Sequence, residues 1–336
     1  FFFFLVGIAY GLAQDNRTSI DKWDADGIIL TDESNTNINM SMMPKGAINE
    51  VEADEAAVIG IAPNVIRKKG TSGDDAKINT TFFGIESDQF LMPEVIEGKA
   101  FENDDEVVAD ISLKEEEGIV IGDTLQLAGS DKEVEVVGFT EDAKFSVAPV
   151  LYTTVSSYQD VRFEQIDESE EGRVSAIVVR GNDGTVEGVD TGNEDLIVYP
   201  IADYINEIPG YTAQVLTFGL MIGFLVVIAA VVIGIFIYVL TMQKSNMFGV
   251  MKAQGISSGY IAKSVVVQTF LLAAIGVGIG LVLTGATALV LPPAVPYRTN
   301  LYFLSGIASL LVIMAMIGGV FSVRAVVKID PLKAIG

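Results

Sequence analysis

The chain has 336 residues, no cysteine, no histidine and a formal net charge of −23. The lack of cysteine excludes disulfides and thiolate metal sites, and the lack of histidine removes the commonest general base and metal ligand. The charge is unevenly divided: residues 1–210 hold 43 acidic and 14 basic side chains, whereas residues 211–336 hold 1 acidic and 7 basic. An acidic, water-soluble part therefore precedes a basic, apolar part, and the acidic surface argues against binding of nucleic acid.

The first predicted element is residues 1–13, FFFFLVGIAYGLA, which are apolar but too short to span a bilayer as a helix. They lack the basic start and the small-residue cleavage site of a signal peptide. We therefore expect the end of a transmembrane helix, with the rest of that helix and a basic cytoplasmic segment preceding Phe1. A remnant of a cleaved signal peptide is the alternative.

Residues 14–210 predict a mixed α/β domain that is large enough to bury a core without disulfides. Strand patterns begin near Gly27 and recur later in the domain. Later strands are predicted at 150–154 and 174–179, and residues 79–85 and 90–96 are short candidates for a strand or a turn. The clearest pattern is 118–138, in which two alternating runs around Gly129 predict a β-hairpin. Residues 104–113, followed by the charged 114–117, predict a short helix.

Two local clusters in this domain admit a binding role. The segment NINMSMMP places Met40, Met42 and Met43 close together. Flexible thioethers can grip an apolar ligand, although ordinary packing is the interpretation we favour. The acidic run 167–171 lacks the ligand spacing and the glycine of an EF-hand, so a solvated loop is favoured over a calcium site.

Three long, almost uncharged stretches follow the domain and predict membrane helices. The first, residues 211–241, is long enough to cross a bilayer and to project beyond it. The other two are 264–291 and 300–323, joined by a proline-rich loop at 292–299. The predicted fold class is therefore an integral membrane α-helical protein with four transmembrane helices, the first truncated, and an inserted mixed α/β extracellular domain.

Basic residues set the predicted orientation of these spans. Three lysines lie in the connection 242–263, and the tail 324–336 holds Arg324, Lys328 and Lys333. Short segments rich in Lys and Arg stay on the cytoplasmic side of a membrane. The connection and the tail are therefore predicted to be cytoplasmic, and the α/β domain is predicted to face the outside of the cell.

The chemistry that the sequence lacks narrows the function. No Walker A motif is present, so the chain is not expected to bind ATP in that manner or to be an enzyme. No ionisable side chain lies inside the predicted spans, which disfavours an ion channel or a proton-coupled carrier. Tyr238 and Tyr211 can ligate ferric haem through a phenolate, although tyrosine near a membrane interface is more often an anchor. No intrinsic cofactor and no metal site are expected.

The connection 242–263 has helical character around 247–254. Gly255 is a natural C-cap, and Ser257 or Ser258 can start the next helix. A short amphipathic helix at this place suits a docking surface for a partner protein. A plain loop between two spans is the alternative.

The order of these elements resembles the MacB/FtsX type of ABC-transporter permease. The coupling helix of that family reads E-I-G-x-L-[KR]-A-x-G. The similar residues in this chain are Met247, Phe248, Gly249, Val250, Met251, Lys252, Ala253, Gln254 and Gly255. Met247 departs from the pattern, since the family often has glutamate there. The ending DPLKAIG at 330–336 resembles the family's D-P-x-x-A-[IL] tail, and 118–138 resembles its V-G-D-x-L…V-x-G segment.

Within this family, residues 238–244, the loop 292–297 and the KAxG helix look most like the HrtB-type haem-exporter permeases of Gram-positive bacteria. The resemblance implies a homodimer in the cell membrane, bound to two copies of a separate ATPase that holds ATP and magnesium. The coupling helix would contact that ATPase, and the span 211–241 would carry its movement to the extracellular domain.

Haem, which partitions into membranes, is the substrate that the resemblance implies. The candidate contacts are Tyr238, Tyr211, Met40, Met42 and Met43. Two alternatives stay open. One is an exporter of antimicrobial peptides or lipids on the same scaffold, and the other is an FtsX-like regulator of a cell-wall hydrolase that transports nothing.

Overall fold

The computed structural model describes residues 1–327, with every side chain among them except Asp75 and residues 322–327. The chain divides into two compact units. Residues 12–215 form one, which we call the α/β unit, and residues 1–11 with 216–336 form the other, the helical unit. The predicted tail motif at 330–336 lies outside the described residues.

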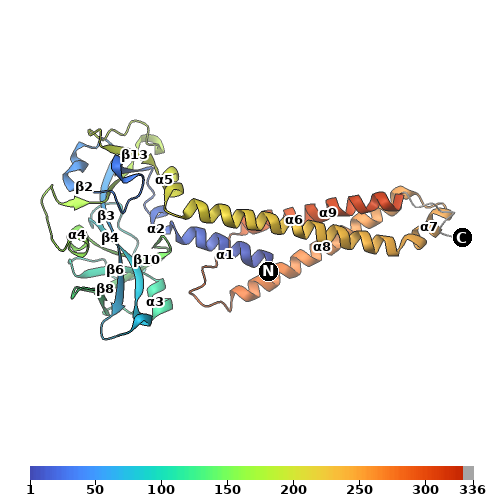
Figure 1. The fold of residues 1–336 in the computed structure, drawn as a ribbon, viewed down its shortest axis with the longest axis horizontal. Coiled ribbons are helices and arrows are strands. Elements are labelled where there is room, and N and C mark those ends of the chain that lie inside the picture. Colours follow the sequence, from blue (N-terminus) through green and yellow to red (C-terminus); the bar gives the residue numbers. More distant parts are fainter. Residues whose placement is uncertain (328–336) are drawn as a thin grey trace. The chain divides into compact units, whose positions relative to one another are not determined.

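The described α/β unit contains thirteen strands. They are β1 (Gly27–Thr31), β2 (Met43–Pro44), β3 (Glu55–Lys68), β4 (Ile78–Ile85), β5 (Glu97–Gly98), β6 (Glu106–Asp110), β7 (Thr124–Leu127), β8 (Glu133–Thr140), β9 (Lys144–Phe145), β10 (Ala148–Thr154), β11 (Arg173–Val174), β12 (Ala176–Arg180) and β13 (Leu196–Pro200). Eleven of them form one sheet with the order β13-β1-β12-β3-β4-β10-β6-β8-β5, to which β7 and β9 are added (Figure 1). Most neighbours are antiparallel, whereas β4–β10 and β6–β8 are parallel.

Short helices cover this sheet, and three hydrophobic clusters form its core, two of them large. The helices are α2 (Thr18–Asp21), α3 (Ser112–Glu117), α4 (Val155–Phe163) and α5 (Ile201–Glu207). One large cluster contains Trp23 and Phe83, and the other large cluster contains Phe82 and Tyr158. Phe82 and Phe83 are neighbours on β4 and point to opposite faces, so the two clusters lie on opposite sides of the sheet. The mixed α/β class predicted for this part is confirmed.

Helix α4 packs on the sheet through Tyr158, because two glycines leave room for its ring. Gly60 on β3 and Gly84 on β4 face each other across the strand pair. A Cβ added at Gly60 would lie 2.2 Å from the Tyr158 ring, and one at Gly84 would lie 2.3 Å from its Cβ. The helix begins at a side-chain cap, in which Thr154 Oγ1 accepts a hydrogen bond from Ser157 N at 3.0 Å.

The predicted hairpin at 118–138 is confirmed. Strands β7 and β8 pair antiparallel, with Thr124 opposite Glu135. Gly129, in the turn between them, has a φ of 79°, a conformation that favours glycine. The predicted strands near Gly27 and in the two later segments are present as β1, β10 and β12, and the candidate at 79–85 is a strand, β4.

The helix predicted at 104–113 with its charged end 114–117 is present only at that end, as α3, because 106–110 form β6 inside the sheet. Every residue of this strand is buried, including its two carboxylates. Glu106 accepts a hydrogen bond from Lys99 Nζ at 2.8 Å and from two backbone N–H groups. Asp110 likewise accepts from two backbone N–H groups. In the sequence, these acidic residues cannot be distinguished from those on a solvated helix face, because their hydrogen-bond partners come together only in the fold.

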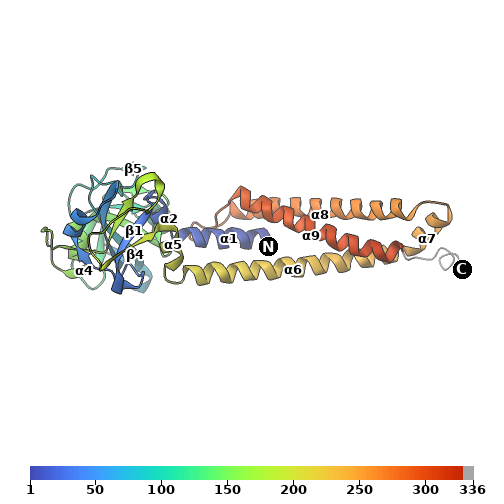
Figure 2. The same cartoon turned by 90° about the horizontal axis from the view of Figure 1, so that it is seen from above.

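The helices of the helical unit are long and apolar. They are α1 (Phe2–Asp15), α6 (Tyr211–Gln243), α7 (Ser245–Ala253), α8 (Ser258–Ala288) and α9 (Leu301–Val327), with α1 and α6 continuing into the α/β unit. Helices α8 and α9 lie side by side, and α9 also approaches α6 where Gly318 meets Gly234 (Figures 1 and 2). By length and composition, α6, α8 and α9 can each cross a membrane. Helix α1 has 14 residues, which is shorter than a span.

The helix that holds the predicted span 264–291 differs in its bounds from that range, because it begins at Ser258 and ends at Ala288. Ser257 caps it, as the sequence indicated, and its side chain accepts a hydrogen bond from Tyr260 N at 3.3 Å. Lys263 therefore lies in the second turn of α8 rather than in a loop. The other spans agree with the observed helices to within four residues.

The loop 292–299 is seated on α1 at two glycines. A Cβ added at Gly7 would lie 2.1 Å from the Tyr297 ring, and one at Gly11 would lie 2.0 Å from the Pro296 carbonyl oxygen. Only a residue without a side chain fits either position in this arrangement. The loop between α8 and α9 thus has a fixed place against the first helix.

Candidate functional site

The predicted coupling segment is a helix, α7, that joins the end of α6 to the beginning of α8. It ends at a glycine cap: Gly255 has a φ of 89° and donates its N–H to Lys252 O, and Ile256 N donates to Met251 O, both at 3.0 Å. Met251 and Ile256 are packed in the same apolar cluster. This pair of hydrogen bonds with a hydrophobic contact across it is a stable way to end a helix.

The inner face of α7 is anchored between the two long helices. Phe248 is only 6% exposed and packs with Ile237 of α6 and with Ile261 and Val265 of α8. Gly249 beside it is also buried. A displacement of α7 therefore acts directly on α6 and α8 through this cluster.

The outer face of α7 is exposed and partly apolar. Met247 is 51% exposed and Val250 is 44% exposed, and Ala253 follows one turn later. Residues three apart share a helix face, so these side chains form one surface strip. Of the predicted coupling residues, this outer group and Gly255 are exposed, while Phe248 and Gly249 are buried.

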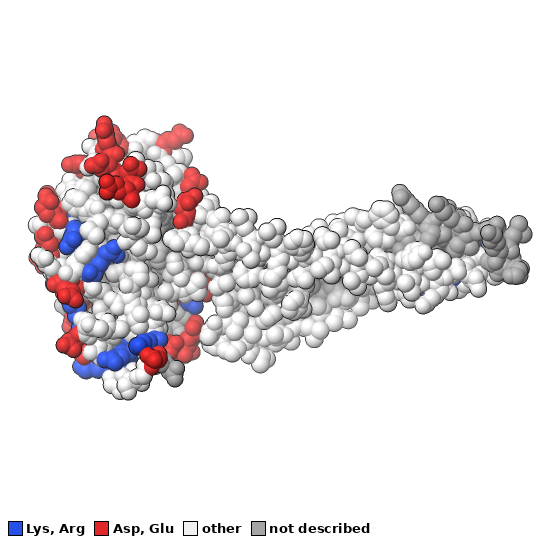
Figure 3. All heavy atoms as spheres, in the orientation of Figure 1, with Lys and Arg blue, Asp and Glu red and all other residues white. Residues whose placement is uncertain are grey.

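The charge near α7 is positive. Lys244 precedes the helix, Lys252 lies in its last turn and Lys263 lies in α8. Residues 211–327 contain no Asp or Glu. By contrast, acidic side chains crowd the face of the α/β unit that Figure 3 shows, and the helices on that face carry hardly any charge.

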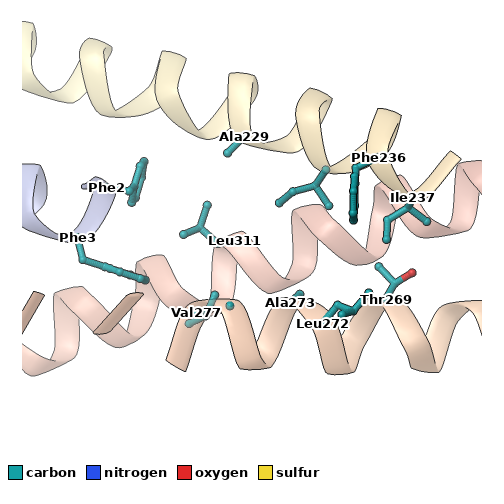
Figure 4. A pocket seen from close by; sticks show the side chains of 12 residues that line it. Phe2, Phe3, Ala229, Phe236, Ile237, Thr269, Leu272, Ala273, Val277 and Leu311 are labelled. Carbon is teal, nitrogen blue, oxygen red and sulfur yellow. The ribbon is translucent and has the colours of Figure 1, made fainter. Parts of the chain in front are cut away.

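An apolar cavity of about 440 Å³ lies among α1, α6, α8 and α9 (Figure 4). Phe2 and Phe3 of α1 approach it from one end, and Phe236 and Ile237 of α6 lie at the other. Thr269 supplies a hydroxyl, which donates to Val265 O at 2.9 Å and is therefore already used. The lining thus suits hydrocarbon and offers no free polar partner.

A second cavity, of about 420 Å³, lies along α6 and α9 and includes Tyr238. The two helices come close here, since a Cβ on Gly318 would lie 3.1 Å from the Cα of Gly234. Met314 of α9 also lines this cavity. The sequence did not single out Met314, because a lone methionine in an apolar span has no distinguishing pattern.

The structure separates the predicted substrate contacts. Tyr211 packs against the core of the α/β unit. Tyr211 and Tyr238 are both on α6, about 40 Å apart at a rise of about 1.5 Å per residue. One ligand of haem size cannot contact both residues in one protomer.

The methionine cluster is also divided. Met43 is 2% exposed and packs in a hydrophobic cluster of the α/β unit, as the packing interpretation predicts. Met40 is 69% exposed, and the Met42 sulfur accepts a weak hydrogen bond from Arg173 at 3.7 Å. The described residues hold no group of three acidic side chains placed to bind a metal ion.

A folded α/β unit joined to three helices that can cross a membrane defines an integral membrane protein with a soluble domain. The chain belongs to the MacB/FtsX family of ABC-transporter permeases. The model of the MacB-like periplasmic core domain matches residues 1–189, and that of the FtsX-like permease C-terminal matches residues 219–331.

Relatives extend over nearly the whole chain. A protein of Staphylococcus epidermidis named as a hemin transport system permease, HrtB, is 23% identical over 99% of this chain and 91% of its own length. An uncharacterized ABC transporter permease of Mycobacterium tuberculosis is also 23% identical over 99% of this chain and 90% of its own. The crystal structure of the periplasmic region of MacB from Actinobacillus actinomycetemcomitans is 13% identical, with a TM-score of 0.38 over 55% of this chain and 92% of that one.

Proposed function

We propose that this permease is the membrane subunit of an ATP-driven exporter that works by transmitting movement, and that it exports haem or a similar membrane-partitioning amphiphile. It acts as a homodimer with two copies of a separate ATPase. The α/β unit lies outside the cell and α7 lies in the cytoplasm. The main support for the proposal is that α7 packs one face against α6 and α8 and leaves the other face exposed.

The exposed strip of α7 suits a protein partner. Met247 and Val250 leave apolar surface in water beside several lysines, and such a surface is stabilised when a complementary groove covers it. The lysines favour a groove with acidic walls. An ATPase that closes on ATP would therefore grip α7 by its outer face.

Helix α6 is suited to carry that movement. Its end is packed against Phe248 of α7 through Ile237, and the helix then runs 33 residues without a break to Tyr211. Tyr211 is packed in the core of the α/β unit. A force applied at α7 is therefore delivered by one continuous helix to the soluble domain.

The cavity that contains Tyr238 and Met314 supports an amphiphilic substrate. Its volume of about 420 Å³ lies in the range usual for small-molecule sites, and its lining is mainly apolar. Phenolate and thioether groups are both known ligands of haem iron. The HrtB relatives are named for hemin transport and come from Staphylococcus, which favours haem as substrate and a Gram-positive source.

The assembly is tested with matched aspartate substitutions in the full chain, coexpressed with its ATPase. Val250→Asp should abolish copurification of the ATPase, because a charge replaces the apolar strip. Val120→Asp, at a residue of similar exposure in the α/β unit, should leave copurification unchanged. Equal recovery of the ATPase with both variants would show that α7 is not the docking helix.

The substrate is tested with the purified complex in lipid nanodiscs. Haem should stimulate ATP hydrolysis, and Tyr238→Phe or Met314→Leu should change the visible absorbance of bound haem. Stimulation by cationic peptides or lipids instead would assign those substrates. Recovery of a cell-wall hydrolase on the α/β unit, with no stimulation by any amphiphile, would favour the regulator.

A further inference from the structure

The ends of α1 and α6 are tied to each other inside the α/β unit. Asn16, which follows α1, donates from Nδ2 to Leu12 O at 2.8 Å and to Gln214 Oε1 of α6 at 3.3 Å. Arg17 pairs with Asp21 at 2.5 Å and lies near Tyr211 at the start of α6. The two helices therefore enter the α/β unit as a connected pair.

The turn that follows β9 is fastened to the end of α1 by its backbone. Val147 N donates to Asp15 O at 3.0 Å, and Ser146 N donates to Asn16 O at 3.1 Å. Ser146 and Val147 have φ values of 49° and 72°, in the left-handed region that a β-branched residue rarely adopts. A strained turn of this kind persists only where the surrounding contacts hold it, and here the contacts come from α1.

Lys144 lies at the centre of the contacts that join the end of α1 to β9 and α3. We call this set of contacts the joint. Its Nζ is 3.4 Å from Asp15 Oδ2 and 3.3 Å from Glu116 Oε1 of α3. Its backbone N–H also donates to Thr18 Oγ1 at 3.0 Å. The Lys144 ammonium thus links Asp15, the last residue of α1, to α3.

The ion cluster is partly buried, which makes each member dependent on the others. Asp15 is almost fully buried and Lys144 is mostly so. Burial by itself lowers the pKa of Lys144, but the carboxylates of Asp15, Glu116 and Asp110 outweigh it and raise that pKa. Removing the cation would take this ion pair away from the buried Asp15 carboxylate, which is strongly unfavourable.

The joint continues into the sheet. Ala143, next to Lys144, donates its N–H to Asp110 Oδ2 at 2.7 Å. Asp110 is the last residue of β6, and its other oxygen accepts from Ser112 N at the start of α3. Contacts therefore run from the end of α1 through β9 to the end of β6 in the sheet.

We infer that Lys144 is a positioning residue for coupling, which fixes the end of α1 to β9 and α3 so that axial movement of α1 and α6 displaces the whole α/β unit. This inference rests on the proposed function, in which that movement is driven by ATP. Lys144 contacts neither substrate nor ATPase. Its role is to keep the helix end from moving independently of the sheet.

The test uses the absence of cysteine, which permits a single spin label at Asp131→Cys on the exposed β7–β8 turn. The complex in nanodiscs gives the distance between the labels of the two copies with and without ATP. Lys144→Ala should abolish the ATP-driven change in distance while the ATPase rate stays within about twofold of the parent. Lys144→Arg, which keeps the charge, should restore the change.

Two further variants separate coupling from folding. Glu116→Gln removes one ion pair and leaves Asp15 paired, so it should reduce the ATP-driven change without loss of the fold. Glu55→Ala breaks an ion pair with Arg180 between β3 and β12, at 2.7 Å and away from α1, β9 and α3, and should leave the change intact. If the parent itself shows no ATP-driven change, the proposed function fails. If the parent responds and both Lys144→Ala and Glu116→Gln respond equally, the inference about Lys144 fails.

Discussion

The anchoring of α7 can be tested by removing its largest buried side chain, with Phe248→Ala. A helix of nine residues is only marginally stable in water, so α7 depends on its packing against α6 and α8. Full burial of a phenylalanine contributes about 2–3 kcal/mol. Because Phe248 is nearly fully buried, its loss should shift the balance between docked and undocked α7 by roughly 30- to 140-fold.

Hydrogen–deuterium exchange of the full chain in nanodiscs measures this shift. The amides of α7 should exchange faster by about that factor in Phe248→Ala, while the strands of the α/β unit keep their protection. Met247→Ala is the matched control, since Met247 is on the same helix and half-exposed, and it should leave exchange unchanged. Equal exchange of α7 in the parent and in Phe248→Ala would refute the argument that this side chain holds the helix in place.

Three other substitutions test packing and charge. Gly60→Ala should destabilise the α/β unit by about 1–3 kcal/mol in thermal unfolding, because its new methyl group meets the Tyr158 ring; an unchanged melting temperature would contradict this. The Lys99 ammonium, with backbone N–H groups, lowers the pKa of Glu106 from 4.5 to about 2, so Glu106 stabilises the fold above pH ~4.5 and loses this effect as the pH falls towards 2. Glu106→Gln should therefore cost about 2 kcal/mol at pH 7 and progressively less below pH 4.5, measured by urea unfolding; a difference independent of pH would argue against it. Gly318→Leu should separate α6 from α9 and lower the melting temperature of the complex, whereas Gly219→Leu, which meets no neighbour, should not.

The membrane helices could be predicted closely from the sequence because their signal is local. A long run without charge determines a span by itself, and Gly255 and Ser257 mark the ends of neighbouring helices by their own conformational preferences. The hairpin around Gly129 was predictable for the same reason. In each case the residues that give the signal are the residues that form the structure.

The sheet was less predictable because its strands depend on distant partners. Residues 106–110 are strand rather than helix since β8 and β10 lie on either side and supply the pairing. The long β3 has Pro63 in its middle, which argues against a strand in the sequence, yet it pairs with β4 on both sides of that residue. Tertiary pairing outweighed the local preference in both places.

The helix of the candidate site could be predicted from the sequence, but its faces could not. The sequence indicated helical character around 247–254 and left a docking helix and a plain loop open, and it could not show which side chains face inward, because that depends on where α6 and α8 lie. The joint around Lys144 had no sequence signal at all. Its carboxylate partners are Asp15 and Glu116, which are distant in the chain and come together only through the fold.

The seating of the loop 292–299 on Gly7 and Gly11 has a mechanical consequence for α1. A ring and a carbonyl group sit in notches one helical turn apart, so the first helix resists both rotation about its axis and sliding past the loop. Either motion would drive a backbone atom of α1 into Tyr297 or Pro296. The crossover from α8 to α9 therefore travels with α1 as a single piece, and a bulkier residue at either notch would free the two to move apart.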